Sequence, residues 1–287
     1  MVRALVMAVS LVLALGCGSK GRGGGKPKVA VSIFPLYDVT RRIAGDRLDV
    51  QLVLPPGRSE HGYDPAPKEI ARLDGAALGL VVGLDLDGWA ETVLRTTGVA
   101  KLVRLGERVE TLPLDGEGGA PDPHFWLDPQ RMVGVVDHIQ AELSALEPSG
   151  ADVFEANARM LQTQLRALDE EIAARSKTWS KHTIVTFHGS MRYFAQRYGV
   201  RIAAVVEPIA GKEPTAPYIA EVLAAIRRSG AAAVFTEPQL DRAPGEMIAT
   251  EAGIPLGELD PIGGVRGRDN YEALLRWNTD QLEAVLR

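Results

Sequence analysis

The stretch that decides the fold is Ala151–Thr178, with the sequence ADVFEANARMLQTQLRALDEEIAARSKT. It contains neither Gly nor Pro, and charged residues fill most of the positions between its apolar ones. The apolar residues recur at spacings of seven, four, three and four: Phe154, Leu161, Leu165, Leu168 and Ile172. These spacings place them on one face of a helix. We therefore predict one long, stiff helix over residues 149–179.

Strands and helices alternate on both sides of this segment. Short apolar runs predict strands on its N-terminal side, over Lys28–Phe34, Leu48–Leu54 and Leu78–Gly83, with helices over Leu36–Ala44 and Glu69–Leu73. The same alternation follows it. Strands are expected over Thr183–Phe187, Ile202–Val206, Ala232–Thr236 and Ile254–Leu259, and helices over Met191–Tyr198, Ala220–Ser229, Pro244–Ala252 and Tyr271–Leu286. Continuous apolar runs are typical of parallel strands that are buried on both faces.

This order of elements predicts an α/β fold with two lobes, each a mainly parallel sheet flanked by helices. The N-terminal lobe is expected over residues 28–148 and the C-terminal lobe over residues 180–287. The long helix would join the lobes and limit large hinge motions between them. The alternative, that this helix belongs to only one lobe, stays open at this point.

The N-terminal segment has the features of an export signal. Arg3 precedes an apolar run, Ala4–Gly16, that is shorter than the roughly 20 residues needed to span a bilayer. The only cysteine of the chain, Cys17, ends this run and resembles the lipid-carrying cysteine of a bacterial lipoprotein signal. We expect a signal peptide over residues 1–17, lipidation of Cys17, and a flexible tether over 18–27. An ordinary signal peptide with an incidental cysteine is the alternative.

Composition excludes several classes of function. The chain has 287 residues, 46% hydrophobic and 24% charged, which is typical of a globular protein. Its 37 acidic residues exceed its 32 Lys and Arg residues, so a nucleic-acid partner is not expected. A single cysteine allows neither an internal disulfide nor a thiolate metal cluster. The 5 histidines are therefore the residues whose positions matter most.

Three of the histidines lie where an α/β fold places its ligands. His61 follows a predicted strand and the turn after it, His124 lies between prolines in DPHFWLDP, and His188 directly follows a strand. Asp260 directly follows the last predicted strand. Ligands of open α/β sheets bind at the carboxyl ends of strands. Three imidazoles and one carboxylate would suit a divalent cation, zinc best among the common metals. Spacing alone leaves a plain surface role open for each of them.

Six segments in a fixed order carry a resemblance to a known family: EHGYDP (60–65), DPHFWLDP (122–129), HGSMRYFAQRYG (188–199), GKEPTAP (211–217), FTEPQ (235–239) and Asp260-Pro261. From about residue 28 to the C-terminus the chain resembles the zinc/manganese-specific solute-binding proteins of bacterial ABC transporters. The resemblance implies two α/β lobes joined by a rigid helix, with the metal in the cleft between them. It also implies a membrane permease and an ATPase as partners.

The same resemblance implies the metal ligands. They fall on His61, His124, His188 and Asp260, so that each lobe supplies two and the ion would hold the lobes together. Glu60 is a nearby candidate, and Glu237 could support a ligand histidine. Trp126 and Tyr63 are expected to pack around the ligand loops.

The expected cargo is Zn²⁺, with Mn²⁺ as the alternative. Residues 107–120 lack the histidine-rich loop of many zinc-uptake members, which weakens the assignment to the zinc branch. The protein is expected to act as a monomer, exported to the periplasm or cell surface and held by its lipid anchor.

Two other functions compete with metal capture. A zinc hydrolase could use the same histidines with an open position for water, and Glu60 or Glu237 as base. The chain has no HExxH motif, however, and Asp260 as a fourth ligand would close the site. A receptor for haem or a siderophore needs an aromatic or basic pocket, and only 6% of the residues are aromatic. We therefore expect a binding protein and not an enzyme.

Overall fold

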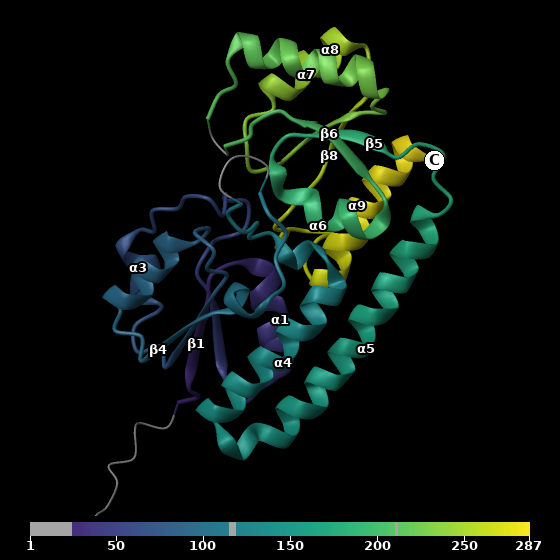
Figure 1. The fold of residues 1–287 in the computed structure, drawn as a ribbon. Coiled ribbons are helices and arrows are strands. Elements are labelled where there is room, and N and C mark those ends of the chain that lie inside the picture. Colours follow the sequence, from purple (N-terminus) through teal and green to yellow (C-terminus); the bar gives the residue numbers. More distant parts are fainter. Residues whose placement is uncertain (1–24, 115–118, 210–211) are drawn as a thin grey trace, which may run out of the picture.

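The computed structural model describes residues 25–114, 119–209 and 212–287. Two parallel four-stranded sheets form the framework of the two lobes (Figure 1). The first has the order β2-β1-β3-β4, with β1 at Lys28–Val31, β2 at Asp49–Leu52, β3 at Leu78–Val81 and β4 at Lys101–Arg104. The second has the order β6-β5-β7-β8, with β5 at Thr183–Thr186, β6 at Arg201–Val205, β7 at Val234–Thr236 and β8 at Leu256–Glu258. The predicted α/β fold with two lobes is confirmed.

Helices cover both faces of each sheet, as parallel strands buried on both sides require. In the N-terminal half they are α1 (Phe34–Ala44), α2 (Pro67–Ala71), α3 (Gly88–Thr96) and α4 (Pro129–Leu146). In the C-terminal half they are α6 (Arg192–Tyr198), α7 (Ala216–Ser229), α8 (Ala243–Ala252) and α9 (Tyr271–Leu286). Within the described ranges, no helix is long and apolar enough to cross a membrane. Cys17 and the rest of the predicted signal peptide lie outside these ranges.

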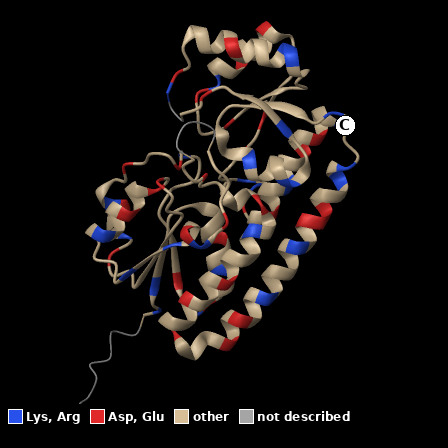
Figure 2. Cartoon of the chain, in the orientation of Figure 1, with Lys and Arg blue, Asp and Glu red and all other residues tan. Residues whose placement is uncertain are grey.

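The predicted long helix is confirmed as α5, Ala151–Ser176. Its 26 residues correspond to a length of about 39 Å at 1.5 Å per residue. It packs along α4 and α1 of the N-terminal half and reaches α9 of the C-terminal half, so it belongs to both lobes (Figure 1). Basic and acidic residues are interspersed along its visible surface (Figure 2). The lobe boundaries near residues 148 and 180 remain a prediction.

One strand and one helix were not expected from the sequence, β4 and α3. β4 is an edge strand whose first residue, Lys101, is exposed, so its sequence KLVR lacks a buried apolar run. α3 follows Asp87, whose buried carboxylate accepts hydrogen bonds from the backbone N–H groups of Val82 and Gly83 at 2.7 and 2.8 Å. Pairing with β3 therefore defines β4, whereas local hydrogen bonds of Asp87 fix the start of α3.

A single core connects the two lobes. Apolar side chains from β1, α1, α4 and α5 belong to the same buried cluster as those from α6, β7 and α9, among them Trp126, Leu165, Tyr193 and Tyr271. Burying each large apolar side chain contributes about 1.5–3 kcal/mol to folding. Smaller clusters lie under α2 and α3 in one lobe and under α7 and α8 in the other. The chain's own packing thus holds the lobes together, independently of any ion.

Candidate metal centre

Each of the three predicted ligand histidines lies in a loop that follows a strand. His61 is in the loop after β2, where its backbone N–H donates to Ser59 Oγ at 3.3 Å. His124 immediately precedes the 3₁₀ turn Phe125–Leu127, and His188 follows β5 directly. His124 and His188 are buried, whereas the side chain of His61 is 27% exposed. The three loops meet where the carboxyl ends of the two sheets face each other.

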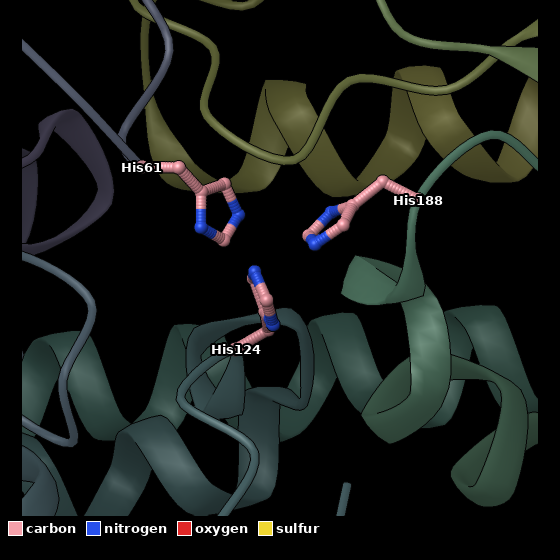
Figure 3. Close-up of side chains that lie close together, drawn as sticks. All are labelled: His61, His124 and His188. Carbon is pink, nitrogen blue, oxygen red and sulfur yellow. The ribbon is translucent and has the colours of Figure 1, made fainter. Parts of the chain in front are cut away.

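The imidazole rings of these residues converge on one point (Figure 3). One ring nitrogen from each of the three lies within 4.8 Å of the other two. The ring centroids are 5.4 Å apart for His61 and His124, 4.4 Å for His61 and His188, and 5.0 Å for His124 and His188. Tetrahedral zinc with Zn–N bonds of roughly 2.0–2.1 Å needs nitrogens about 3.3 Å apart.

Asp122 fixes the orientation of His124. The Asp122 carboxylate oxygen Oδ1 lies 2.8 Å from His124 Nδ1 and accepts the His124 backbone N–H at 2.9 Å. Nδ1 is therefore the nitrogen that carries the proton, and Nε2 keeps its lone pair. Nε2 is buried and has no hydrogen-bond partner among the described residues. A buried acceptor left unpaired in this way is suited to coordinate a cation. This role of Asp122 was not expected from the sequence, although the acid two residues before the histidine was a visible signal.

Burial keeps the other two imidazoles neutral. It lowers the pKa of His61 to about 4, with a smaller contribution from the charge of His124. Burial also lowers the pKa of His188 well below its usual value, and the neighbouring His124 and His61 lower it further. Both side chains are thus unprotonated at neutral pH. Metal binding needs neutral imidazoles, so no proton has to be displaced from these two.

Two buried carboxyl groups lie beside the histidines. Glu60 Oε1 is 3.9 Å from His61 Nε2, and Glu237 Oε1 is 3.8 Å from His188 Nδ1. Ser190 Oγ donates a hydrogen bond of 2.7 Å to Glu237. Burial raises the pKa of both carboxyl groups, that of Glu237 well above its usual value. Glu60 and Glu237 lie next to the triangle of nitrogens but are not members of it.

Asp260 is fully buried and also lies outside the triangle. Its Oδ1 atom accepts three hydrogen bonds, from the backbone N–H groups of Ile262 and Gly263 and from Gln239 Nε2. Its negative charge raises the pKa of both Glu60 and Glu237, which places it within electrostatic reach of the site. Its role as a metal ligand stays a prediction.

The two aromatic residues singled out from the sequence are structural. Trp126 is fully buried with its ring centroid 5.2 Å from that of His124, as expected. Its Nε1 donates to the carbonyl of Pro261 at 2.7 Å and so connects the loops of the two lobes. Tyr63 packs against Trp89, with centroids 5.5 Å apart, and Trp89 Nε1 donates to the Glu60 carbonyl at 2.9 Å. Tyr63 therefore supports the His61 loop through Trp89.

Comparison with known proteins places the chain in a family. Residues 29–285 match the family model described as "Zinc-uptake complex component A periplasmic". The chain belongs to this family. The family is one of uptake components and not of enzymes, as expected from the sequence. A crystal structure of ZnuA has the same fold, with a TM-score of 0.82 and 25% identity over 92% of this chain and 100% of that one.

Two relatives bind different metals. The zinc-binding lipoprotein AdcA of Streptococcus pneumoniae serotype 4 is 27% identical over 298 residues, which cover 97% of this chain. The chain spans only 60% of the length of AdcA. The manganese-binding lipoprotein MntA of Halalkalibacterium halodurans is 29% identical over 286 residues, covering 96% of this chain and 95% of MntA. Similarity to relatives thus supports metal binding without choosing the metal.

Proposed function

We propose that this protein captures one divalent metal ion outside the cytoplasm and delivers it to the permease of an ABC importer, whose ATPase drives transport. The observation that carries the proposal is the triangle of His61, His124 and His188 nitrogens, all within 4.8 Å of one another. Imidazoles that converge in this way, two of them with pKa values lowered by burial, are suited to bind an ion. The matches to a zinc-uptake component and to metal-binding lipoproteins support the delivery step.

Zinc is the proposed cargo, and manganese is the alternative. Imidazole ligands suit zinc, whereas manganese prefers carboxylate and water oxygens. Three nitrogens form the triangle here, and the carboxyl groups of Glu60 and Glu237 lie outside it. Asp260 is proposed as the fourth ligand, and its carboxylate would offset part of the charge of the ion.

The protein is proposed to work as a monomer held to the membrane by a lipid on Cys17. The position of this cysteine after an apolar run supports the anchor, and AdcA and MntA are both named lipoproteins. The hydrolase alternative is disfavoured by the match to a family of uptake components.

The test is metal titration of the purified chain after removal of bound metal with a chelator. Competition against zinc and manganese indicators should give one ion per chain and tighter binding of zinc. His124→Ala should abolish tight binding. His182→Ala is the matched control, because His182 is exposed and remote in the fold from the triangle, and it should bind like the parent. Failure to bind either ion, or equal binding by His124→Ala, would refute the proposal.

A further inference from the structure

We propose that Arg268 determines the metal preference of the site by holding the free carboxylate oxygen of Asp260. The inference rests on the proposed function, because it concerns which divalent ion the same site selects. Arg268 lies in the loop between β8 and α9, eight residues after Asp260, and no sequence motif pointed to it.

The hydrogen bonds of Asp260 leave one oxygen for a metal. Oδ1 already accepts its three bonds, and the backbone is fixed by Asn278, which accepts the Asp260 N–H at 2.8 Å and donates to the Asp260 carbonyl at 2.7 Å. Oδ2 is buried and accepts no hydrogen bond within the described part of the chain. Any coordination by Asp260 must therefore use Oδ2 unless this network breaks.

The Arg268 guanidinium occupies the space beside this oxygen. Its Nε atom lies 3.2 Å from Asp260 Oδ2, and its Nη1 atom lies 3.6 Å from Glu258 Oε1. The guanidinium also lies over the indole ring of Trp277, 4.1 Å from the ring centroid. The Arg268 backbone closes a tight turn, in which it donates to Val265 at 2.9 Å and accepts from Gly264 at 2.8 Å. Its side chain is only 15% exposed, and its Nε and Nη1 atoms have no hydrogen-bond partner among the described residues, so its attraction to the two carboxylates is ionic.

A positive charge at this distance makes Oδ2 a poorer metal ligand. An ion that binds Oδ2 has to share the oxygen with the guanidinium, and the two cations repel each other in a buried site where screening is weak. The cost differs between metals. Zinc can rely on the three imidazole nitrogens, whereas manganese depends more on carboxylate oxygens. Arg268 therefore lowers manganese affinity more than zinc affinity, and this difference makes the site selective for zinc.

The experiment compares three substitutions of Arg268. Arg268→Gln and Arg268→Met remove the charge, and Met keeps apolar packing on Trp277 if Gln impairs folding. Arg268→Lys keeps the charge. We expect the neutral variants to bind manganese about tenfold more tightly and zinc only about threefold more tightly, because manganese gains more from a free carboxylate oxygen. Arg268→Lys should stay close to the parent. Unchanged or weakened manganese affinity in folded neutral variants would overturn the inference.

A double-mutant cycle with Asp260→Asn tests whether Arg268 acts through Asp260. In the Asp260→Asn background, replacing Arg268 with Gln should change neither the zinc affinity nor the manganese affinity. Asp260→Asn should in turn weaken metal binding more in the Arg268→Gln background than in the parent. The visible spectrum of cobalt(II) bound in place of zinc reports on the ligands of the ion. A purely structural role of Arg268 would leave this spectrum unchanged. The cobalt(II) spectrum should change in Arg268→Gln, as the bond between the Asp260 carboxylate and the ion strengthens, and not in the double variant. Equal effects of Arg268→Gln in both backgrounds would overturn the coupling.

The outcomes separate this inference from the proposed function. If His124→Ala binds zinc like the parent, the proposed metal site is wrong and Arg268 has no bearing on it. If His124→Ala loses zinc while Arg268→Gln and Arg268→Met leave the zinc-to-manganese ratio unchanged, only the assignment to Arg268 fails.

Discussion

Replacing Asp122 tests how far the metal site depends on residues that do not touch the ion. Asp122 is fully buried, and its Oδ1 receives both the ring Nδ1–H and the backbone N–H of His124, at 2.8 and 2.9 Å. Asp122→Ala leaves these two donors unpaired and frees the ring to rotate or to change tautomer. Loss of a residue that orients a metal-ligating histidine typically costs 10–100-fold in metal affinity. This loss of affinity corresponds to a loss of roughly 1.4–2.8 kcal/mol in the free energy of metal binding.

The assay is chelator-competition titration of zinc with the parent, Asp122→Ala and Asp122→Asn. Asn keeps an oxygen acceptor without the charge, so we expect its affinity to lie between those of the other two. Asp122→Ala should also lower the free energy of unfolding of the metal-free protein by about 1–3 kcal/mol, because a buried donor loses its partner. Zinc affinity equal to that of the parent in a folded Asp122→Ala variant would refute the orienting role.

Four further predictions concern stability, metal affinity and attachment to the membrane. The pKa of His61 is about 4 when folded and near 6.5 when unfolded, so the unfolded chain binds more protons between these values. The contribution of His61 to the stability of the metal-free protein should therefore be present above pH 6.5 and be lost toward pH 4, as urea unfolding across this range can measure. His188→Ala should lose more zinc affinity than Asp260→Asn in competition titrations, and the reverse order would contradict the three-nitrogen site. Trp126→Phe leaves the Pro261 carbonyl without its indole donor, and should lower the free energy of unfolding by about 1–2 kcal/mol in the same urea assay. Cys17→Ala should move the protein from the membrane to the soluble fraction, and persistent membrane association on fractionation would contradict lipidation.

Much of the fold could be predicted because its signals are local. The apolar face of Ala151–Thr178 predicted α5, and the periodic segment Tyr271–Leu286 predicted α9 with both of its ends correct. Buried strands such as β3 were recognisable as continuous apolar runs. β4 was missed because an edge strand with an exposed Lys101 needs no such run, and pairing with β3 alone defines it. Pairing between distant segments leaves no recognisable pattern in the local sequence.

The candidate site, like the fold, could be predicted only in part from the sequence. His61 and His188 after strands, His124 in the DPHFWLDP segment and the family resemblance together predicted a common location, and the structure brings one nitrogen of each within 4.8 Å of the others. The state of each side chain could not be predicted in this way. Arg268 Nε lies 3.2 Å from Asp260 Oδ2, and Asp122 Oδ1 lies 2.8 Å from His124 Nδ1. Both facts require side-chain positions that spacing does not contain.

Contacts between the lobes already join them, so metal binding is not needed to hold them together. From the sequence, an ion bridging His61 and His124 to the other lobe was expected to hold the lobes together. In the structure the ligand loops are already joined, because Trp126 donates to the Pro261 carbonyl and accepts the hydroxyl of Tyr271 at 2.6 Å. Tyr193 adds a third connection, donating to the Asp122 carbonyl at 2.6 Å. Because the chain itself fixes the three nitrogens close to their binding geometry, little of the binding free energy is spent on ordering the site.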